Sequence, residues 1–481
     1  MKWFLALTEI PHPTFDCKNL SDKIVEWIKK MGVSPEQDLF GNICVRINAH
    51  ELPDDSPVVS IQAHIDMVWV GEYVDGRIDV SYEAGKVIAK KSTLGADDGF
   101  GVAMILQFIE ERNSFPHGPM ELILTVDEEQ GLQGVKKLPK KNGSSDQIRP
   151  FSFKYLINCD SLSGDKVYIG AAGGEIAEIL FALKSSPLSS SQSLIKIDID
   201  NLSGGHSGGC IHLGRANGTK LIVRLLNNLI DKDICFQLSN FQSGVQMNLI
   251  PTHSTAIIAV DSSSVSDALF IISEAYNEII KEFKGIENPD FSAQKIEAMN
   301  DEKVFNVDDT RSLLTFLTLV SVGPLRMSPL FPTIVDTSQN LGVVRIDVQK
   351  NNCIVHLFCR SATQTKIIEN TQVTNNLLRY IPLQHTVIYK RASVAWPPDD
   401  NNKLAKMMQD AYSEENGVRK EIGLLHVTIE PPEFNVLGYD AEMISVCPSI
   451  PMAHCIGEWM DVEEAMKWRN AVCRLLSKIR E

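Results

Sequence analysis

The stretch ELILTVDEEQG (residues 121–131) begins as an apolar strand and ends in three adjacent acids, Asp127, Glu128 and Glu129. Like charges this close repel one another, and burying even one of them without a partner costs free energy. Two explanations are open: water surrounds all three acids, or a strongly positive group lies among them. The positions of the other acids and histidines decide between them.

The first third of the chain alternates strand and helix patterns. SPVVSIQAHID (56–66) and FKYLINCDS (153–161) read as buried strands with polar ends, and DDGFGVAMILQFIEER (97–112) reads as an amphipathic helix. Strands that alternate with helices are typical of a mostly parallel sheet covered on both faces. The sequence therefore predicts an α/β fold.

The pattern changes near residue 175, where LIKIDID (194–200) followed by TKLIVRLLNNLI (219–230) favours an α+β module. After residue 395 the first style returns, with a helix, the strand-like LLHVTIE (424–430) and a closing helix over 461–480. We therefore predict one α/β catalytic domain, residues 1–172 and 395–481, interrupted by an inserted domain over 173–394.

Composition limits the class of partner. The 481-residue chain has a net charge of -15, which disfavours a nucleic-acid groove, and it contains no apolar run long enough to span a membrane. The apolar run at WFLAL (3–7) is too short for a signal peptide, so we expect a first helix there. The 10 cysteines are scattered without a C-x-x-C pair, which favours reduced thiols in a cytoplasmic protein and disfavours a thiolate zinc site.

Acids and a histidine follow several of the predicted strands or begin the helix between them. They are His64 and Asp66, Asp97 and Asp98, the triplet 127–129, and Asp160. Ligands of open α/β sheets bind at this edge of the sheet, so we expect these groups to lie together. A pair of divalent cations about 4 Å apart would neutralise them. His64 suits one cation, with Asp66 orienting its imidazole, and His454, which we expect immediately before a helix, supplies a second imidazole.

Each of these residues also has a simpler explanation when it is taken alone. On that explanation, His64 is either a surface histidine or one with satisfied hydrogen bonds, the acidic triplet is a solvated loop, and Asp160 caps a helix. Asp97 and Asp98 are favourable charges at a helix N-terminus. Only their joint placement at strand ends favours the metal site.

The ordered motifs HIDMV, GADDGFG, TVDEEQG, LINCDS and GGHSGGCIHLGRAN, with the late AH, closely resemble the aminoacyl-histidine (Xaa-His, carnosinase-like) dipeptidases. These belong to the co-catalytic zinc aminoacylase and dipeptidase superfamily. The resemblance runs from EIPHPT (9–14) to the last helix. It implies a two-zinc catalytic domain with an inserted lid and dimerisation domain, in a homodimer.

The resemblance also implies roles for individual residues. Asp97 would bridge both ions, His64 and Asp160 would complete one shell, and Glu129 and His454 the other. Glu128 would be the general base toward a water that bridges the ions, and Asp66 the acid that orients His64. Asp127 has no assigned role beyond a guess at backbone capping.

The inserted domain contributes three further candidates through the resemblance. His206 would donate a hydrogen bond to the oxyanion, often in the partner subunit's site, and Asn217 and Arg360 would hold the substrate's C-terminal carboxylate. GGHSGG (204–209) is also compatible with a flexible turn, and Arg360 with a structural ion pair. We expect His212 and His426 to be structural.

The chain departs from the family pattern at several places. Asp98 stands where Asn is usual, Ser161–Asp165 lacks an acid-rich run, Cys455–Glu458 replaces Ser-Pro-Asp-Glu, and HVTIE (426–430) replaces His-Ala-Gly-Leu-Glu. None of these departures removes a predicted metal ligand, but they leave the identity of the substrate undecided.

The sequence thus predicts a zinc dipeptidase that cleaves unblocked dipeptides such as Xaa-His or carnosine, with manganese or cobalt also fitting the ligand types. Two alternatives remain: an N-acyl amino-acid amidohydrolase, and a catalytically silent binding or scaffold protein. The silent protein would have no chemical need for Glu128.

Overall fold

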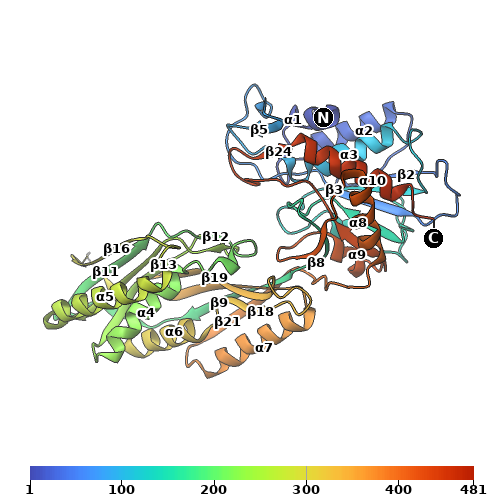
Figure 1. Ribbon diagram of the computed structural model, residues 1–481. Coiled ribbons are helices and arrows are strands. Elements are labelled where there is room, and N and C mark those ends of the chain that lie inside the picture. Colours follow the sequence, from blue (N-terminus) through green and yellow to red (C-terminus); the bar gives the residue numbers. More distant parts are fainter. Residues whose placement is uncertain (299–300, 481) are drawn as a thin grey trace. The chain divides into compact units, whose positions relative to one another are not determined.

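The computed structural model describes residues 1–298 and 301–480 (Figure 1). The chain divides into two compact units. The first comprises Met1–Ala171 and Ser393–Glu481, and the second comprises Ala172–Ala392. The sequence predicted these changes at 172/173 and at 394/395.

The first unit is built on an eight-stranded sheet with the order β1-β2-β6-β3-β7-β23-β8-β22. These strands are β1 Glu36–Gln37, β2 Ile43–Ile47, β3 Val59–His64, β6 Met120–Thr125, β7 Tyr155–Asn158, β8 Lys166–Ala171, β22 Glu421–Leu425 and β23 Glu442–Ser445. A smaller sheet, β24-β5-β4, contains β4 Val80–Glu83, β5 Lys86–Ala89 and β24 Trp459–Asp461. The helices are α1 Lys2–Thr8, α2 Lys18–Lys30, α3 Ala96–Glu110, α8 Lys403–Asn416, α9 Pro431–Val436 and α10 Val462–Leu476, with the 3₁₀ turn η1 Val135–Lys137.

The centre of this sheet is parallel. β3 pairs in parallel with β6 and β7, and β23 pairs in parallel with β7. Every residue of β3, β6 and β7 is buried, which requires cover on both faces. Gly101 lets α3 approach the sheet closely, because a Cβ there would lie 2.8 Å from Cβ of Ala63 and 2.5 Å from Cβ of Cys159. The predicted α/β fold class is confirmed.

The second unit contains a nine-stranded sheet with the path β16-β11-β15-β13-β19-β20-β9-β21 and with β18 paired to β19. Its strands are β9 Gly173–Ala182, β11 Gln192–Asp200, β13 Phe236–Ser243, β15 Ser254–Asp261, β16 Asp290–Ile296, β18 Gly323–Met327, β19 Val335–Asp347, β20 Asn352–Ser361 and β21 His385–Ser393. Two-stranded ribbons are formed by β10 Ser185–Pro187 with β17 Lys303–Phe305, and by β12 Gly205–His206 with β14 Leu249–Ile250. The helices are α4 Gly218–Asp231, α5 Val265–Ile279, α6 Val307–Leu319 and α7 Gln364–Tyr380, with 3₁₀ turns η2 Ile211–Leu213, η3 Ser262–Ser264 and η4 Ile280–Phe283.

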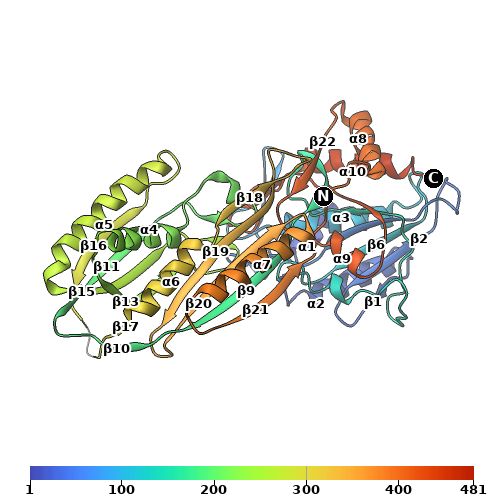
Figure 2. The same ribbon diagram turned by 90° about the horizontal axis from the view of Figure 1, so that it is seen from below.

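The second unit contains the same βαββαβ module twice. The inner module runs β11-α4-β13-β15-α5-β16, and the outer module runs β9-α6-β19-β20-α7-β21. In each module the strands lie in the order fourth, first, third, second, and the two second strands, β13 and β19, pair antiparallel. The inner module is inserted between the first strand and first helix of the outer one. Figure 2 shows α4, α5, α6 and α7 alongside the strands of this sheet. A large hydrophobic core includes buried residues of all four helices and of strands from both modules.

Two local predictions were wrong. The strand expected over LLHVTIE ends at Leu425, and residues 426–430 leave the sheet to begin α9. His454 does not immediately precede a helix: it lies in a turn, and β24 separates it from α10, which begins at Val462. Among the described residues, no helix has both the length and the apolar character needed to cross a bilayer.

Candidate active site

The predicted metal-type residues of the first unit converge at the carboxyl ends of its parallel strands. His64 is the last residue of β3, Glu128 and Glu129 follow β6, and Asp160 follows β7. Asp97 lies in the first turn of α3. Three groups each have donor atoms within 4.8 Å of one another: His64 with Asp97 and Asp160, Asp97 with Glu129 and His454, and His64 with Glu128 and Glu129. The first two groups match the two ligand sets that the resemblance implies.

Asp97 is the central carboxylate of this cluster. Its Oδ1 lies 3.1 Å from Nε2 of His64, and its Oδ2 lies 2.8 Å from Nε2 of His454. Nε2 of His454 is also 2.9 Å from Oε1 of Glu129. Burial acts to raise the pKa of Asp97, but the hydrogen bonds from His454 and His64 outweigh it and bring that pKa below its usual value.

Asp66 contacts both His64 and the turn that carries Glu128 and Glu129. Nδ1 of His64 lies 2.9 Å from the backbone oxygen of Asp66 and 3.5 Å from its Oδ1. A proton donated from Nδ1 to that carbonyl leaves the lone pair of Nε2 facing Asp97. The Asp66 carboxylate instead accepts hydrogen bonds from the backbone N–H groups of Glu128 (2.9 Å) and Glu129 (3.3 Å). Asp66 therefore fixes both the imidazole and the turn that carries the two glutamates.

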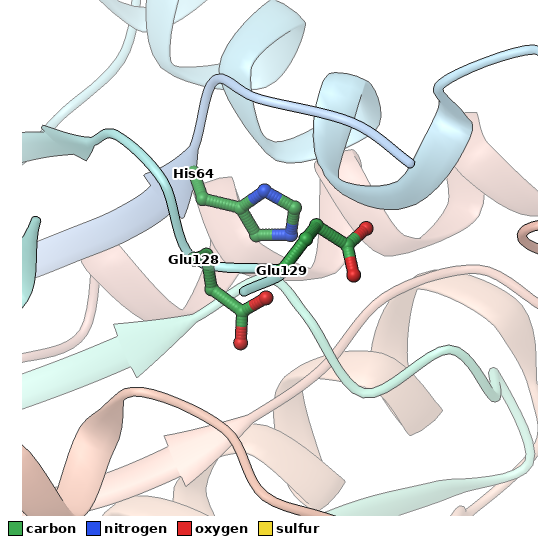
Figure 3. A group of neighbouring side chains, drawn as sticks. All are labelled: His64, Glu128 and Glu129. Atoms are coloured by element: carbon green, nitrogen blue, oxygen red, sulfur yellow. The ribbon is translucent and has the colours of Figure 1, made fainter. Parts of the chain in front are cut away.

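The side chains of Glu128 and Glu129 come from the segment after β6 and lie beside the imidazole of His64 (Figure 3). Glu128 is buried, with 7% of its surface exposed, and this burial raises the pKa of its carboxyl well above the usual value. A carboxylate with raised basicity beside a cluster of ligands is suited to accept and return a proton.

The donor set fits divalent cations. In the described part of the chain, the ion pairs of Asp97 and Glu129 run only to His64 and His454. Burial disfavours the charged form of His454, but Asp97 and Glu129 overcome this and raise its pKa to about 11. Imidazole nitrogen and carboxylate oxygen are the ligands that zinc and similar cations take in proteins, and a cation here would take over the neutralising role of the histidine protons.

Asp127 and Asp98 contact the backbone instead. Oδ1 of Asp127 accepts a hydrogen bond from the N–H of Phe15 at 2.7 Å, which ties the N-terminal segment to the turn after β6. Oδ1 of Asp98 accepts from the N–H of Gly101 at 3.1 Å, whereas its Oδ2 has no hydrogen-bond partner in the part of the chain that the structure describes. Burial raises the pKa of Asp98 well above the usual value, which favours a neutral carboxyl.

Glu458 is a buried residue of the site that the sequence reasoning did not select. Its carboxylate accepts hydrogen bonds from four consecutive N–H groups, those of residues 94, 95, 96 and 97, at 2.8–3.4 Å. It lies four residues after His454, so it joins the segment of one predicted ligand to the segment of another. Its spacing from His454 was the available signal. Glu430 was also missed as a site component, and it contacts residues of β3 and β6.

Two of the remaining candidates meet inside the second unit. Nη2 of Arg360, on β20, lies 3.2 Å from Nε2 of His206, on β12, and its Nε lies 3.4 Å from Oγ of Ser207. Arg360 thus comes from the outer module and His206 from the inner one. Burial lowers the pKa of the Arg360 guanidinium to about 10, and within the described residues its Nη1 has no hydrogen-bond partner. A buried cation with an unsatisfied donor is suited to receive an anion.

The loop that carries His206 is held at both ends. The carboxylate of Glu287 accepts from the N–H of Ser203 at 2.8 Å and from the N–H of Ala216 at 2.9 Å. Asn217 caps α4: its side chain accepts from the N–H of Lys220 and donates to the backbone oxygen of Leu341. Both ends of that amide have protein partners, and a substrate contact by Asn217 stays a prediction.

Comparisons with known proteins agree with this geometry. The chain is 28% identical over 482 residues to a protein named cytosol non-specific dipeptidase from Escherichia coli K12, covering 99% of this chain and 96% of that protein. The crystal structure of aminoacylhistidine dipeptidase from Vibrio alginolyticus superposes with a TM-score of 0.83 at 25% identity, covering 100% of this chain and 96% of the other. A tripeptidase from Staphylococcus aureus shares the fold, with a TM-score of 0.59 at 14% identity, covering 100% of this chain and 97% of the other.

Residues 60–478 match peptidase family M20/M25/M40. That range begins within β3, ends beyond α10 and includes all the acids and histidines that converge in the first unit. The expectation of a peptidase, drawn from the ordered motifs, is therefore confirmed. The chain belongs to peptidase family M20/M25/M40 and is a hydrolase.

Proposed function

We propose that this protein is a metal-dependent dipeptidase that hydrolyses the peptide bond of unblocked dipeptides. One observation carries the proposal: two groups of metal-type donors share Asp97, and the buried carboxyl of Glu128 lies beside them. A pair of donor groups with one common carboxylate is suited to two cations held close together. A carboxylate at their side is suited to proton transfer.

His64, Asp97 and Asp160 would hold one cation, and Asp97, Glu129 and His454 the other. When bound, such cations supply Lewis acidity that polarises the peptide carbonyl and acidifies the attacking water. Zinc, manganese and cobalt all accept these ligands, and we propose zinc.

Glu128 accepts the proton of the attacking water and returns it to the departing amine. Its burial supports this role, because a carboxyl of raised pKa holds a proton long enough to deliver it. Asp66 supports the same step by fixing the N–H of Glu128 at 2.9 Å from its own Oδ1. In this proposal Asp66 positions Glu128 as well as His64.

Arg360 and His206 would recognise the negative end of the substrate. The unsatisfied Nη1 of Arg360 favours a carboxylate ligand, and the adjacent Nε2 of His206 offers a second polar contact. We further propose that His206 donates to the oxyanion of the reaction. A requirement for a free carboxylate fits a substrate with an unblocked C-terminus.

The names of the relatives support the substrate class. One is named a non-specific dipeptidase and the other an aminoacylhistidine dipeptidase. We propose dipeptides as the substrates, with Xaa-His and carnosine-like peptides among them. We also propose a cytosolic location, supported by the name of the E. coli relative, and we expect a homodimer.

A substrate panel tests the proposal. Purified protein should hydrolyse Ala-His and carnosine in the presence of bound divalent metal, which elemental analysis measures on the same sample. Turnover restricted to N-acetyl amino acids would instead identify an N-acyl amino-acid amidohydrolase. Metal-replete protein that cleaves none of these compounds would support a silent binding protein.

Substitution of Arg360 by methionine should raise KM for an unblocked dipeptide by roughly 10- to 100-fold, because one charge-assisted hydrogen bond contributes about 1.5–3 kcal/mol. KM for the matching dipeptide amide should change little, since the amide lacks the carboxylate. Arg345→Met, which removes an exposed arginine on β19 of the same sheet, serves as the control. Equal changes in KM for the acid and the amide would show that Arg360 is only structural.

A further inference from the structure

Five buried polar side chains form a continuous layer in the first unit. They are Gln62, Thr125, Asn158, Glu430 and Ser445, and each has 0% of its surface exposed. We call them the polar layer. Thr125, Asn158 and Ser445 are the last residues of β6, β7 and β23, and Gln62 lies two residues before the end of β3. Glu430 is the residue before α9. Polar side chains in the interior of an α/β sheet cost free energy unless every one is satisfied, so their connections matter.

The hydrogen bonds of the polar layer run in one direction. Nδ2 of Asn158 donates to Oε1 of Gln62 at 2.8 Å, and Nε2 of Gln62 donates to Oε2 of Glu430 at 2.5 Å. Oγ1 of Thr125 donates to the same Oε2 at 2.7 Å. Glu430 is therefore the common acceptor at which the chain of donors ends. An apolar side chain at this position would remove the shorter acceptor of both donors, which would leave Nε2 of Gln62 only its 3.2 Å hydrogen bond to Oγ1 of Thr125 and that hydroxyl only its 3.3 Å hydrogen bond to the backbone oxygen of Ala63.

The polar layer lies immediately upstream of the predicted metal ligands. Gln62 is two residues before His64, and Thr125 is three residues before Glu128. Asn158 is two residues before Asp160, and its Oδ1 accepts the backbone N–H of Asp160 at 3.2 Å and Oγ of Ser445 at 2.5 Å. These side chains thus connect neighbouring strands just before the turns that carry the predicted metal ligands.

The strand pairing ends before these turns. The last paired residues of the three strands include His64 with Thr125 and Gln62 with Asn158, and the ligand-bearing turns after β6 and β7 lie beyond them. Side-chain hydrogen bonds across the strand ends restrict the remaining freedom, because breaking any of them would leave a buried polar group with fewer partners. Oε2 of Glu430 receives these bonds, whereas its Oε1 has no hydrogen-bond partner among the described residues. Hydrogen bonds behind metal ligands set the orientation of those ligands.

We propose that Glu430 is a positioning residue. Through the polar layer it sets the spacing between His64, the Glu128–Glu129 turn and Asp160, and thereby the affinity and geometry of the cation site. This inference rests on the proposed function, because it concerns the cations proposed there. Glu430 itself touches none of the reacting atoms in this scheme.

The test compares cation binding by four proteins: wild type, Glu430→Leu, Glu430→Gln and Thr125→Val. Competition with a chromogenic chelator gives the Kd for Zn²⁺, and the visible spectrum of the Co²⁺ form reports coordination geometry. Glu430→Leu should raise Kd by about 10- to 100-fold and alter the Co²⁺ bands, because it removes the common acceptor. Glu430→Gln retains an acceptor oxygen of the same shape and should restore nearly wild-type Kd. Thr125→Val removes one donor and should give an intermediate Kd.

Ser60→Ala is the matched control. Ser60 lies two residues before Gln62 on β3, is equally buried, and donates a single hydrogen bond to the backbone oxygen of Glu121 outside the polar layer. Its loss should lower thermal stability without changing the Kd or the Co²⁺ spectrum.

The outcomes separate the two proposals. If wild type binds no divalent cation, the proposed function fails, and this inference fails with it. If wild type binds cations and hydrolyses dipeptides, but Thr125→Val and every folded Glu430 variant bind like Ser60→Ala, only the positioning role is overturned. If Glu430→Leu does not fold, the Kd values of Thr125→Val and Glu430→Gln decide whether the positioning role holds, since both substitutions keep the packing volume.

Discussion

Replacement of Glu128 by glutamine is expected to lower kcat for an unblocked dipeptide by about 10²- to 10⁴-fold while leaving bound metal unchanged. Glutamine keeps the shape of the side chain, and the backbone N–H of residue 128 can still donate to Oδ1 of Asp66 at 2.9 Å. The amide, however, cannot take a proton from water. The loss should therefore appear in kcat with little change in KM. Steady-state kinetics and elemental analysis of the same preparation measure both quantities.

The adjacent acid provides the control. Asp127→Asn keeps an oxygen that can accept the N–H of Phe15, so its activity should stay within about threefold of wild type on the general expectation for conservative changes that preserve a hydrogen bond. The metal content of Glu128→Gln is a separate test, because Glu128 lies in one of the three groups that could hold a metal. Loss of metal from Glu128→Gln would make Glu128 a ligand and would contradict its assignment as the base.

Replacement of Asp97 by asparagine should abolish both cation retention and hydrolysis. The two carboxylate oxygens of Asp97 lie 3.1 Å from Nε2 of His64 and 2.8 Å from Nε2 of His454, so one substitution weakens both donor groups. Wild-type protein at a cation concentration of 100 times Kd should gain about 2.7 kcal/mol of unfolding free energy for a single site. The variant should lose this gain, which thermal unfolding with and without added Zn²⁺ measures.

Asp98→Asn is the paired control for Asp97→Asn. The asparagine oxygen can still accept the N–H of Gly101, and the raised pKa of Asp98 already favours a carboxyl without charge. Cation-dependent stabilisation should therefore persist in Asp98→Asn. Equal losses in both variants would point to a general disturbance of the α3 N-terminus, and the assignment of Asp97 as the shared ligand would then be withdrawn.

Much of the site could be predicted because its residues obey a local rule. A parallel strand places whatever follows it at the carboxyl edge of the sheet, so His64, Glu128, Glu129 and Asp160 had to meet once β3, β6 and β7 paired. His454 was selected because the predicted site needed a second imidazole, and the family motifs then assigned it to the shell with Glu129; no strand pattern indicated it. Its local structure was predicted wrongly, since the turn around it depends on β24 and on contacts distant in sequence.

The supporting residues could not be predicted in the same way. Glu430 and Gln62 are 368 residues apart, and Glu458 contacts backbone groups 361–364 residues away. LLHVTIE has the alternation of a strand, yet the chain leaves the sheet at Leu425 and delivers Glu430 to the polar layer. Local propensity was overridden there by hydrogen bonds that exist only after the strands have assembled.

By itself, the sequence determined the α/β class, the peptidase family and the set of acids and histidines at the strand ends. These follow from periodicity and from short motifs, which depend on neighbours along the chain. The tertiary structure alone decided that Asp66 accepts a hydrogen bond from the glutamate turn and that Arg360, from one βαββαβ module, contacts His206 from the other. It also decided that Glu430 and Glu458 form hydrogen bonds with the segments that carry the predicted ligands. Each of these contacts joins segments remote in sequence, and their partners are selected by packing and burial rather than by any local pattern.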